Sequence, residues 1–333
     1  MNEKKLLKKI EDEISLTEDK IKKSEQQKRL EDIYKYYNEE DKVISSIEAK
    51  KNIEKLEKEG EGKLLIKSRY KELDKIIDGF REGNLIVVSG PTGHGKTTWC
   101  QNVTENIIKD NIKSLWFSFE VPVEEFLEKF EEDLPLFYLP KTLKDNTMIW
   151  IEQRIIESIV KFGTKVVFID HLNYIIDTNS FDKSINSSYQ IGILMRELKK
   201  IAIRWKIAIF LMAHLKQPQI DKPPTLSDLR DSSFIAQESD FVIILWRKAK
   251  KNTIPPVLGN KAILSVQKNR RTGKGGNISL YHENGRLKEL DREIENITGN
   301  THQGIKPERT REINEKQEEI AKTDLGDLPI EDD

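Results

Sequence analysis

The segment that most constrains the fold spans residues 90–97 and has the sequence GPTGHGKT. It follows an apolar run typical of a buried strand, residues 84–90, and precedes a segment with helical spacing, residues 98–110. A segment of the form GxxxxGK[ST] at such a junction turns its backbone N–H groups around phosphates, and the following helix adds its positive end. The sequence therefore predicts an α/β domain that binds nucleotide phosphates.

Individual residues of this phosphate loop have different expected roles. Lys96 is placed to reach the β- and γ-phosphates, and Thr97 to ligate Mg²⁺. His94 lies inside the loop, where side chains point away from the phosphates, so we expect no catalytic role for it. The expected nucleotide-binding set is Gly90, Pro91, Thr92, Gly93, His94, Gly95, Lys96, Thr97 and Thr98.

The region around this loop alternates between apolar runs and amphipathic segments. Continuous β-branched and aromatic runs predict strands buried on both faces of a mainly parallel sheet. The expected strands are residues 84–90, 114–120, 165–170, 208–214, 241–247 and 262–267, and the expected helices are residues 98–110, 148–162 and 189–205. The predicted fold is an α/β sandwich.

Two charged flanks enclose this core, which we place at residues 66–292. Residues 1–65 lack proline and are rich in Lys, Glu, Leu and Ile, which predicts a helical arm that is either solvated or packed on a neighbouring subunit. Residues 293–333 are polar and end in an acidic tail, from which we expect a largely flexible segment. These boundaries define three segments.

Composition excludes several classes of protein. The formal net charge is −1, so any nucleic-acid site must be a local basic patch. Cys100 is the one cysteine, which rules out an intramolecular disulfide and a cysteine-based zinc cluster. No run approaches the ~20 apolar residues of a membrane span, and the N-terminus lacks the apolar run of a signal peptide. We therefore expect a cytoplasmic protein, in the host cytoplasm if the chain is viral.

Two acids end strands next to the phosphate loop. Asp170 ends the run at residues 165–170, where phosphate-loop proteins hold Mg²⁺, although an aspartate there could also cap a helix. Glu120 ends the run at residues 114–120 and emerges at the same carboxyl edge of a parallel sheet. A carboxylate there can orient and deprotonate a water molecule. The alternative for Glu120 is a surface acid before the turn at Pro122.

Five stretches together resemble the DnaB-like replicative helicases, including the helicase half of phage helicase–primases and the mitochondrial helicase Twinkle. They are SRYKELDKIIDGFREGNLIVVSG, FSFEVPVEEF, FIDHLNYI, MAHLKQP followed by LSDLRDSSFIAQESDFVIILWR, and QKNRRTGKGGNISLYHENGRL. The likeness spans roughly residues 68–290 in the family's order. It implies a RecA-like phosphate-loop ATPase core.

The resemblance also implies roles for residues of the ATP site. Glu120 would be the catalytic base and Asp170 the Mg²⁺ ligand. The γ-phosphate contacts would come from His214 and Gln237, although a histidine at the end of a strand is also compatible with a structural role. Arg270, with Lys268 nearby, would be a finger that reaches a neighbouring subunit's ATP. Because the next residue, Arg271, is also an arginine, the finger could instead be Arg271. Arg247 and Tyr281 resemble the pair that encloses the base.

The segment at residues 214–233 is similar to the family's DNA-binding loop. Its cations are Lys216, Lys222 and Arg230, which would follow phosphates of single-stranded DNA without reading sequence. The alternative is a solvated loop with ordinary basic residues. The sequence departs from the family at residues 230–233, RDSS, where many members have a glycine-containing step. The globular N-terminal domain of cellular members and the phage primase half are also not matched.

The leading functional prediction is an ATP- and Mg²⁺-dependent, ring-forming replicative DNA helicase that translocates 5′ to 3′ on single-stranded DNA as a hexamer. Expected partners are forked DNA, primase and a polymerase that the acidic tail at residues 324–333 would contact. Two alternatives remain: a RecA-family recombinase or remodelling ATPase that does not unwind DNA, and an ATP-gated interaction module without essential chemistry.

Overall fold

A computed structural model of the chain describes residues 43–59, 62, 64–130, 134–175, 187–215, 223–229, 232–249 and 257–290. The chain divides into two compact units, Met1–Lys63 and Leu64–Asp333. In the first unit, helix α2 (Ser46–Lys58) is capped by Ser45, whose hydroxyl accepts a hydrogen bond from the Glu48 backbone. None of its residues is buried. The prediction of helices in residues 1–42 lies outside the described residues.

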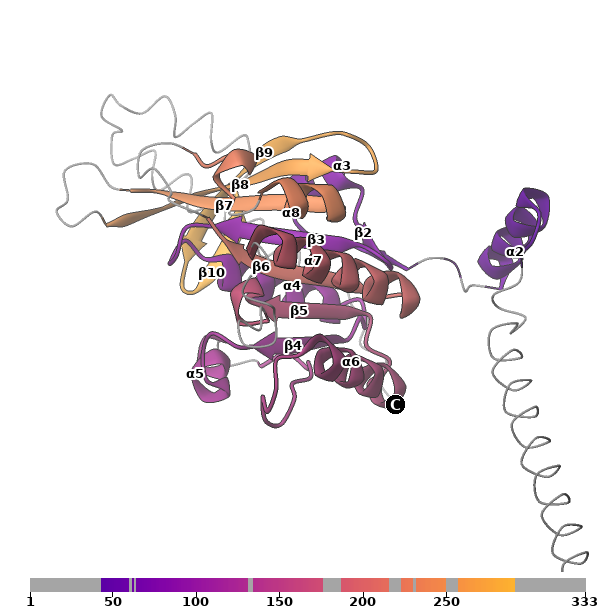
Figure 1. Ribbon diagram of the computed structural model, residues 1–333. Helices are drawn as coiled ribbons and strands as arrows, with labels where there is room; N and C mark the ends of the chain where they lie inside the picture. Colours follow the sequence, from indigo (N-terminus) through magenta and orange to yellow (C-terminus); the bar gives the residue numbers. More distant parts are fainter. Residues whose placement is uncertain are drawn as a thin grey trace, which may run out of the picture. The chain divides into compact units, whose positions relative to one another are not determined.

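The second unit is an α/β domain (Figure 1). Its strands are β1 (Leu65–Ile66), β2 (Phe80–Arg81), β3 (Leu85–Gly90), β4 (Ser114–Ser118), β5 (Val166–Asp170), β6 (Ala208–His214), β7 (Phe241–Ala249), β8 (Leu258–Asn269), β9 (Gly276–Glu283) and β10 (Arg286–Glu289). Its helices are α3 (Lys71–Ile77), α4 (Lys96–Ile108), α5 (Val123–Glu128), α6 (Met148–Phe162), α7 (Ser187–Arg204) and α8 (Ser232–Glu238), with 3-10 turns η2 (Leu172–Tyr174) and η3 (Leu226–Asp228). Among the described residues, no helix combines the length and apolar character needed to cross a membrane.

The central sheet has the strand order β10-β9-β8-β7-β3-β6-β5-β4. Strands β7, β3, β6, β5 and β4 run parallel, whereas β8, β9 and β10 extend the sheet as antiparallel neighbours. The prediction of an α/β fold with a mainly parallel sheet is confirmed. The strand predicted at residues 262–267 is longer than expected, and it joins the antiparallel part of the sheet.

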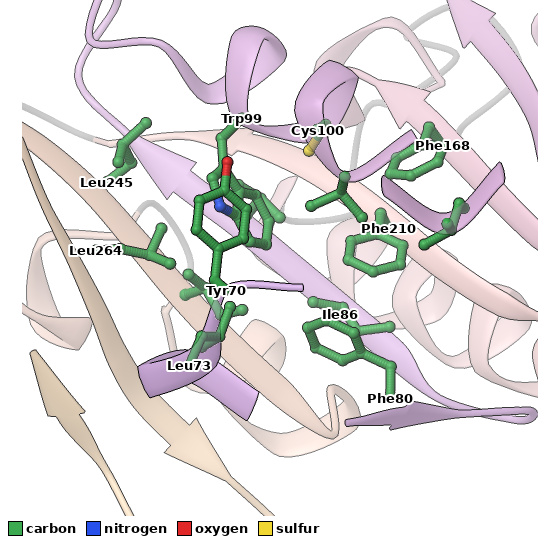
Figure 2. Close-up of a cluster of buried hydrophobic side chains, with 14 of the residues drawn as sticks. Tyr70, Leu73, Phe80, Ile86, Trp99, Cys100, Phe168, Phe210, Leu245 and Leu264 are labelled. Atoms are coloured by element: carbon green, nitrogen blue, oxygen red, sulfur yellow. The ribbon is translucent and has the colours of Figure 1, made fainter. Parts of the chain in front are cut away.

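Two apolar cores cover the two faces of this sheet. Strand β3 shows how they are separated, because Ile86 and Val88 belong to one core and Leu85 and Val87 to the other. On the first face, Trp99 of α4 packs near Phe210 and Tyr70 (Figure 2). On the second face, α6 and α7 contribute their buried residues. The result is a three-layer sandwich with helices on both sides of the sheet.

The parallel strands bring distant segments to one edge. Gly90 pairs with His214, and Ser118 pairs with Asp170, so the ends of β3, β6, β4 and β5 meet there. We call this the carboxyl edge. The opposite, amino edge contains Asp240, whose carbonyl accepts a hydrogen bond from the Arg270 backbone at 2.8 Å. These two edges separate the candidate functional residues into two groups.

Candidate active site

The phosphate loop connects β3 to α4 at the carboxyl edge. A Cβ at Gly90 would lie 2.2 Å from the carbonyl oxygen of Leu245, so only glycine allows β3 to approach β7 this closely. Gly95 has a φ of +99° and immediately precedes the first residue of α4, Lys96. Glycine is therefore required both where the loop leaves the strand and where it enters the helix.

The Lys96 side chain, at the start of α4, contacts the beginning of the loop. Its Nζ donates hydrogen bonds to the carbonyl oxygens of Gly90 at 3.1 Å and Pro91 at 3.2 Å. Burial lowers the pKa of this ammonium group, while Asp170 and Glu120 oppose the change. The charge is thus buried among weak acceptors that phosphate oxygens can replace.

Thr97 and Asp170 form a pair of oxygen ligands beside Lys96. The Thr97 hydroxyl donates to Asp170 Oδ2 at 2.7 Å, while Asp170 Oδ1 is buried without a hydrogen-bond partner among the described residues. Burial raises the pKa of Asp170 to about 6. A hydroxyl and a partly unsatisfied carboxylate are ligands that suit Mg²⁺, so this pair fits the expected metal.

Glu120 and His214 lie at the same edge, together with His171. Glu120 is exposed in the turn after β4, and its Oε2 lies 3.9 Å from His171 Nε2. The His171 and His214 rings are nearly perpendicular, with centroids 4.1 Å apart, and His214 Nδ1 is buried without a partner among the described residues. The sequence analysis gave His171 no role, although its place directly after Asp170 was a usable signal.

The His94 side chain contacts β7. Its Nδ1 accepts a hydrogen bond of 2.9 Å from the Arg247 backbone, and burial lowers its pKa to about 4. The neutral ring therefore connects the loop to β7. Pro91, Thr92 and Gly93 form the turn before it, and Thr98 is half-buried in the first turn of α4.

Arg247 and Tyr281 lie on strands that flank β8. The register pairs Arg247 with Ala262, and Tyr281 with the adjacent Lys261. Arg247 Nε donates to the carbonyl of Gly259 at 3.0 Å, and the Tyr281 hydroxyl accepts from Asn260 at 3.2 Å. Contacts with β8 therefore hold both side chains near the carboxyl edge, where the phosphate loop lies.

Gln237, Lys268 and Arg270 lie near the amino edge instead. The Lys268 ammonium donates to the carbonyls of Ala236 and Ser239, and burial lowers its pKa. Gln237 is exposed near the end of α8. Because β3 has six residues, the amino edge lies about 17 Å from the phosphate loop. The structure does not bring these three residues to the chain's own phosphate loop.

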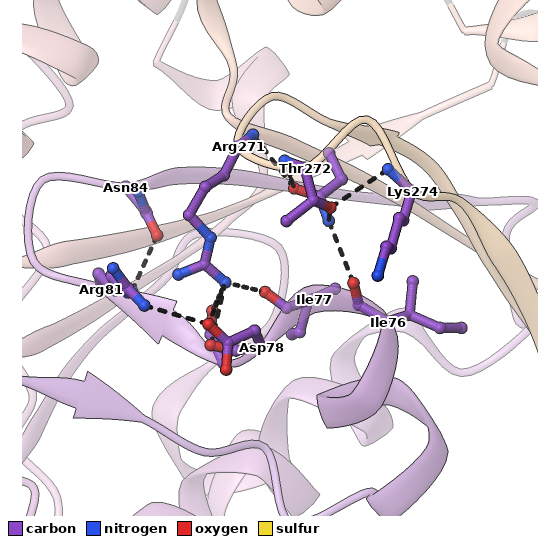
Figure 3. Close-up of polar contacts among 10 residues, drawn as sticks. Ile76, Ile77, Asp78, Arg81, Asn84, Arg271, Thr272 and Lys274 are labelled. Atoms are coloured by element: carbon purple, nitrogen blue, oxygen red, sulfur yellow. Dashed lines mark hydrogen bonds and ion pairs between the residues drawn. The ribbon is translucent and has the colours of Figure 1, made fainter.

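Neighbouring Arg270 and Arg271 differ in their surroundings. The Arg271 guanidinium donates to the backbone carbonyls of Ile77 and Asp78 and lies 3.3 Å from the Asp78 carboxylate (Figure 3). Arg271 therefore holds the end of α3. Arg270 has an exposed side chain, and among the described residues none accepts a hydrogen bond from its guanidinium. The geometry favours Arg270 as the cation available to another molecule.

Lys216, Lys222 and Arg230, the expected DNA contacts, lie outside the described residues. Part of the same loop is described, where Thr225 and Asp228 form a capping box around η3. An isolated bridge pairs Leu215 with Leu229, so the loop begins and returns beside the end of β6. This places Leu215 and Leu229 together at the carboxyl edge.

Comparison with known proteins identifies the family. Residues 65–133 and 137–289 match the family described as DnaB-like helicase C terminal domain, which is most of the chain. The chain belongs to this family. The match confirms the resemblance stated from the sequence, and nucleotide use follows from membership of DnaB-like ATPases.

The curated relatives of this DnaB-like chain are named as replicative helicases. A probable replicative DNA helicase of Trieres chinensis is 28% identical over 56% of this chain and 48% of its own length. The DnaB of Mycoplasma pneumoniae is 26% identical over 65% and 54%, and the DnaC of Bacillus subtilis is 25% identical over 81% and 65%. The chain thus spans about half to two thirds of the length of these relatives.

Solved structures support the DnaB-like fold. One, described as an ATPase domain, is similar with a TM-score of 0.60 and 20% identity, covering 75% of this chain and all of that one. A DnaB-like replicative helicase, described with its interactions with primase, has a TM-score of 0.56 and 21% identity, covering 75% and 68%. These identities show the fold alone.

Proposed function

We propose that the chain is the motor of a ring-forming replicative DNA helicase that hydrolyses ATP between subunits. The observation that carries this proposal is the separation of its charged groups. Lys96, Thr97 and Asp170 lie at the carboxyl edge, whereas Arg270 lies exposed at the amino edge. An arginine so far from its own phosphate loop can serve an ATP site only in a neighbouring copy.

Residues at the carboxyl edge divide the chemistry among them. Lys96 exchanges its carbonyl acceptors for the β- and γ-phosphates. Thr97 and Asp170 would hold Mg²⁺, which would neutralise phosphate charge. Glu120 orients the attacking water and accepts its proton. His214 contacts the γ-phosphate, and Arg247 and Tyr281 enclose the base.

The amino edge completes the next site around the ring. Arg270 reaches the neighbour's γ-phosphate, where an arginine finger is worth about 10³-fold or more in rate. Gln237 assists at the same interface, and Lys268 supports it by fixing the end of α8. Hydrolysis at successive interfaces of a hexamer moves the loop at residues 214–233, through Lys216, Lys222 and Arg230, 5′ to 3′ along one DNA strand.

Partners follow from this activity. Forked and single-stranded DNA are the substrates, a primase and a polymerase are the expected protein partners, and the site of action is the cytoplasm. A recombinase is not favoured, because the family match covers most of the chain and the relatives are named replicative helicases.

Purified protein provides the test. We expect single-stranded DNA to stimulate ATP hydrolysis, a forked duplex with a 5′ tail to be unwound, and rings to form with a non-hydrolysable ATP analogue in electron microscopy. Unwinding is measured with fluorophore-labelled forks whose single tails have opposite polarity. Rings that unwind neither fork, or filaments that exchange strands, contradict the proposal.

A further inference from the structure

His171 is a buried side chain that the proposed mechanism does not use. It follows Asp170 directly and is 6% exposed. Its ring packs against Tyr174, with centroids 4.8 Å apart, and against His214, with centroids 4.1 Å apart. These contacts hold the imidazole in one position between the Mg²⁺ ligand and the γ-phosphate contact.

A backbone hydrogen bond determines which nitrogen of His171 carries the proton. The Asn173 N–H donates to His171 Nδ1 at 3.2 Å. Because a backbone N–H is only a donor, Nδ1 must be unprotonated. An imidazole ring without a proton on Nδ1 is neutral, because the charged form carries a proton on both nitrogens. A neutral imidazole with a bare Nδ1 carries its proton on Nε2.

The Nε2–H faces the proposed catalytic base. Nε2 lies 3.9 Å from Glu120 Oε2, longer than the ~3.2 Å limit of a good hydrogen bond. The Glu120 side chain is 35% exposed and lies in a turn, so it has room to move, whereas His171 does not. Catalytic hydrogen bonds are often long before the substrate binds and shorten in the complex.

We propose that His171 is a positioning residue that donates its Nε2–H to the Glu120 carboxylate when nucleotide is bound. The bond fixes one carboxylate oxygen and leaves the other to accept the proton from the attacking water. His214 supports the ring from the side. This inference rests on the proposed function, because it assigns a partner to the base of the same reaction.

The same three side chains also resemble a metal site. Each of Glu120, His171 and His214 offers one possible ligand atom, and these three atoms lie within 4.8 Å of one another. Two histidines and one carboxylate are a set of ligands that binds transition metals. A metal on His171 Nε2, however, needs a lone pair there and an acceptor at Nδ1. The Asn173 N–H at Nδ1 is a donor, so the geometry favours a hydrogen-bond donor over a metal ligand.

Two variants of one residue test the proposal. His171→Leu removes the donor, and His171→Gln keeps an N–H near the position of Nε2. We expect His171→Leu to lower kcat of DNA-stimulated ATP hydrolysis about 10- to 100-fold with KM for ATP nearly unchanged, and His171→Gln to recover most of that loss. Tyr174→Phe, which keeps the packed ring and loses only a hydroxyl, is the matched control with unchanged kcat.

Melting temperatures establish that each variant is folded. A folded His171→Leu protein with the kcat of the wild type overturns the proposal, as does a Gln variant no better than Leu. A raised KM with unchanged kcat assigns His171 to nucleotide binding instead and also overturns it. Wild-type protein without ATPase activity contradicts the proposed function itself, so the two failures are distinguishable.

A second measurement does not depend on activity. The chain has five histidines, and the ¹⁵N spectrum of their rings, assigned by comparison with His171→Gln, reports the tautomer of each. We expect a protonated Nε2 and a bare Nδ1 for His171, with and without an ATP analogue. The opposite tautomer, or Zn²⁺ binding that His171→Gln abolishes, shows that Nε2 is a lone-pair donor and overturns the proposal.

Discussion

The parallel and antiparallel halves of the sheet position functional residues in different ways. In the parallel half, β3, β4, β5 and β6 all end at the carboxyl edge, so residues from four segments meet in one site. In the antiparallel half, β8 reverses direction beside β7, and its end returns to the amino edge with Arg270. The first half brings the phosphate loop, Asp170 and His214 together within one chain.

On the proposed function, the second half makes that site depend on a neighbouring copy of the chain. Arg270 is attached to the same sheet as Lys96 but lies one strand length away from it. The contact between Arg271 and the end of α3 anchors this far corner, so the exposed guanidinium of Arg270 projects from a rigid support. Substitutions in one half at a time can therefore separate the contributions of the two.

The largest effect is expected in the parallel half, from Lys96→Ala. Without the ammonium group the loop loses its cation for the β- and γ-phosphates, so ATP hydrolysis and unwinding should fall to background, a loss of more than about 10³-fold. Phosphate release with single-stranded DNA is the measurement. Lys109→Ala, on the exposed turn after α4, is the control and should retain full activity. Residual unwinding by Lys96→Ala would show that the motor does not reside in this half.

Sequence reasoning succeeded best in the parallel half. Its strands are covered on both faces, so they are continuous apolar runs, and the expected strand at residues 208–214 coincides with β6. Strands β9 and β10 were missed because β9 alternates buried and half-exposed residues, and β10 has only four residues. Helices α3 and α5 were missed because they are too short to show a helical period.

In the candidate site, too, some features could be predicted from the sequence and others could not. The phosphate loop and Asp170 follow from local patterns, because each is defined by its position at the end of a strand. The surroundings of Arg271 depend on contacts between the end of α3 and the end of β8, which are far apart in the sequence. The tautomer of His171 depends on the turn geometry that brings the Asn173 N–H to its ring, which the residue types alone do not give. Their roles were therefore beyond the sequence analysis.

The next prediction compares Arg270 with Arg271. Arg270→Ala should lower kcat about 10³-fold and leave the melting temperature unchanged, because its side chain is exposed. Arg271→Ala should instead lower the free energy of unfolding by about 1–3 kcal/mol, since carbonyls at the end of α3 lose a charged donor.

Mixing subunits tests whether Arg270 acts between chains. Arg270→Ala and Lys96→Ala proteins should each be inactive, but a mixed ring contains some interfaces with a wild-type Lys96 and a wild-type Arg270. ATP hydrolysis should therefore reappear on mixing. Activity that stays at background in rings of verified mixed composition places Arg270 in its own chain's site and removes the distinction between the two halves.

A smaller effect concerns the stability cost of Asp170. Burial raises its pKa from 3.8 to about 6, so the folded protein disfavours the ionised form. Because the folded state binds this proton more tightly than the unfolded state, stability should rise as pH falls through 6 towards 4. Asp170→Asn keeps an acceptor for Thr97 and should raise the free energy of unfolding by about 1–2 kcal/mol at pH 7.5, after the cost of burying its amide.

The measurement is chemical unfolding without nucleotide or divalent cation, between pH 5 and 8. The Asn variant should lose hydrolysis and lack the wild-type rise in stability towards low pH. An Asn variant less stable than the wild type at pH 7.5 would mean that Asp170 is ionised at little cost in the folded protein.

The smallest effect tests how the antiparallel half is attached. The Tyr70 hydroxyl, before α3, donates to the carbonyl of Leu287 on β10 at 2.8 Å, and the Tyr70 ring is buried against Trp99 of α4. Tyr70→Phe keeps the ring and removes only that hydrogen bond, so the free energy of unfolding should fall by about 1 kcal/mol. Hydrogen exchange should show the loss concentrated in β9 and β10, with the amides of β3 and β6 unchanged. Equal loss of protection in both halves would show that the sheet unfolds as one unit, and that the division between a catalytic and an assembly half is one of function and not of stability.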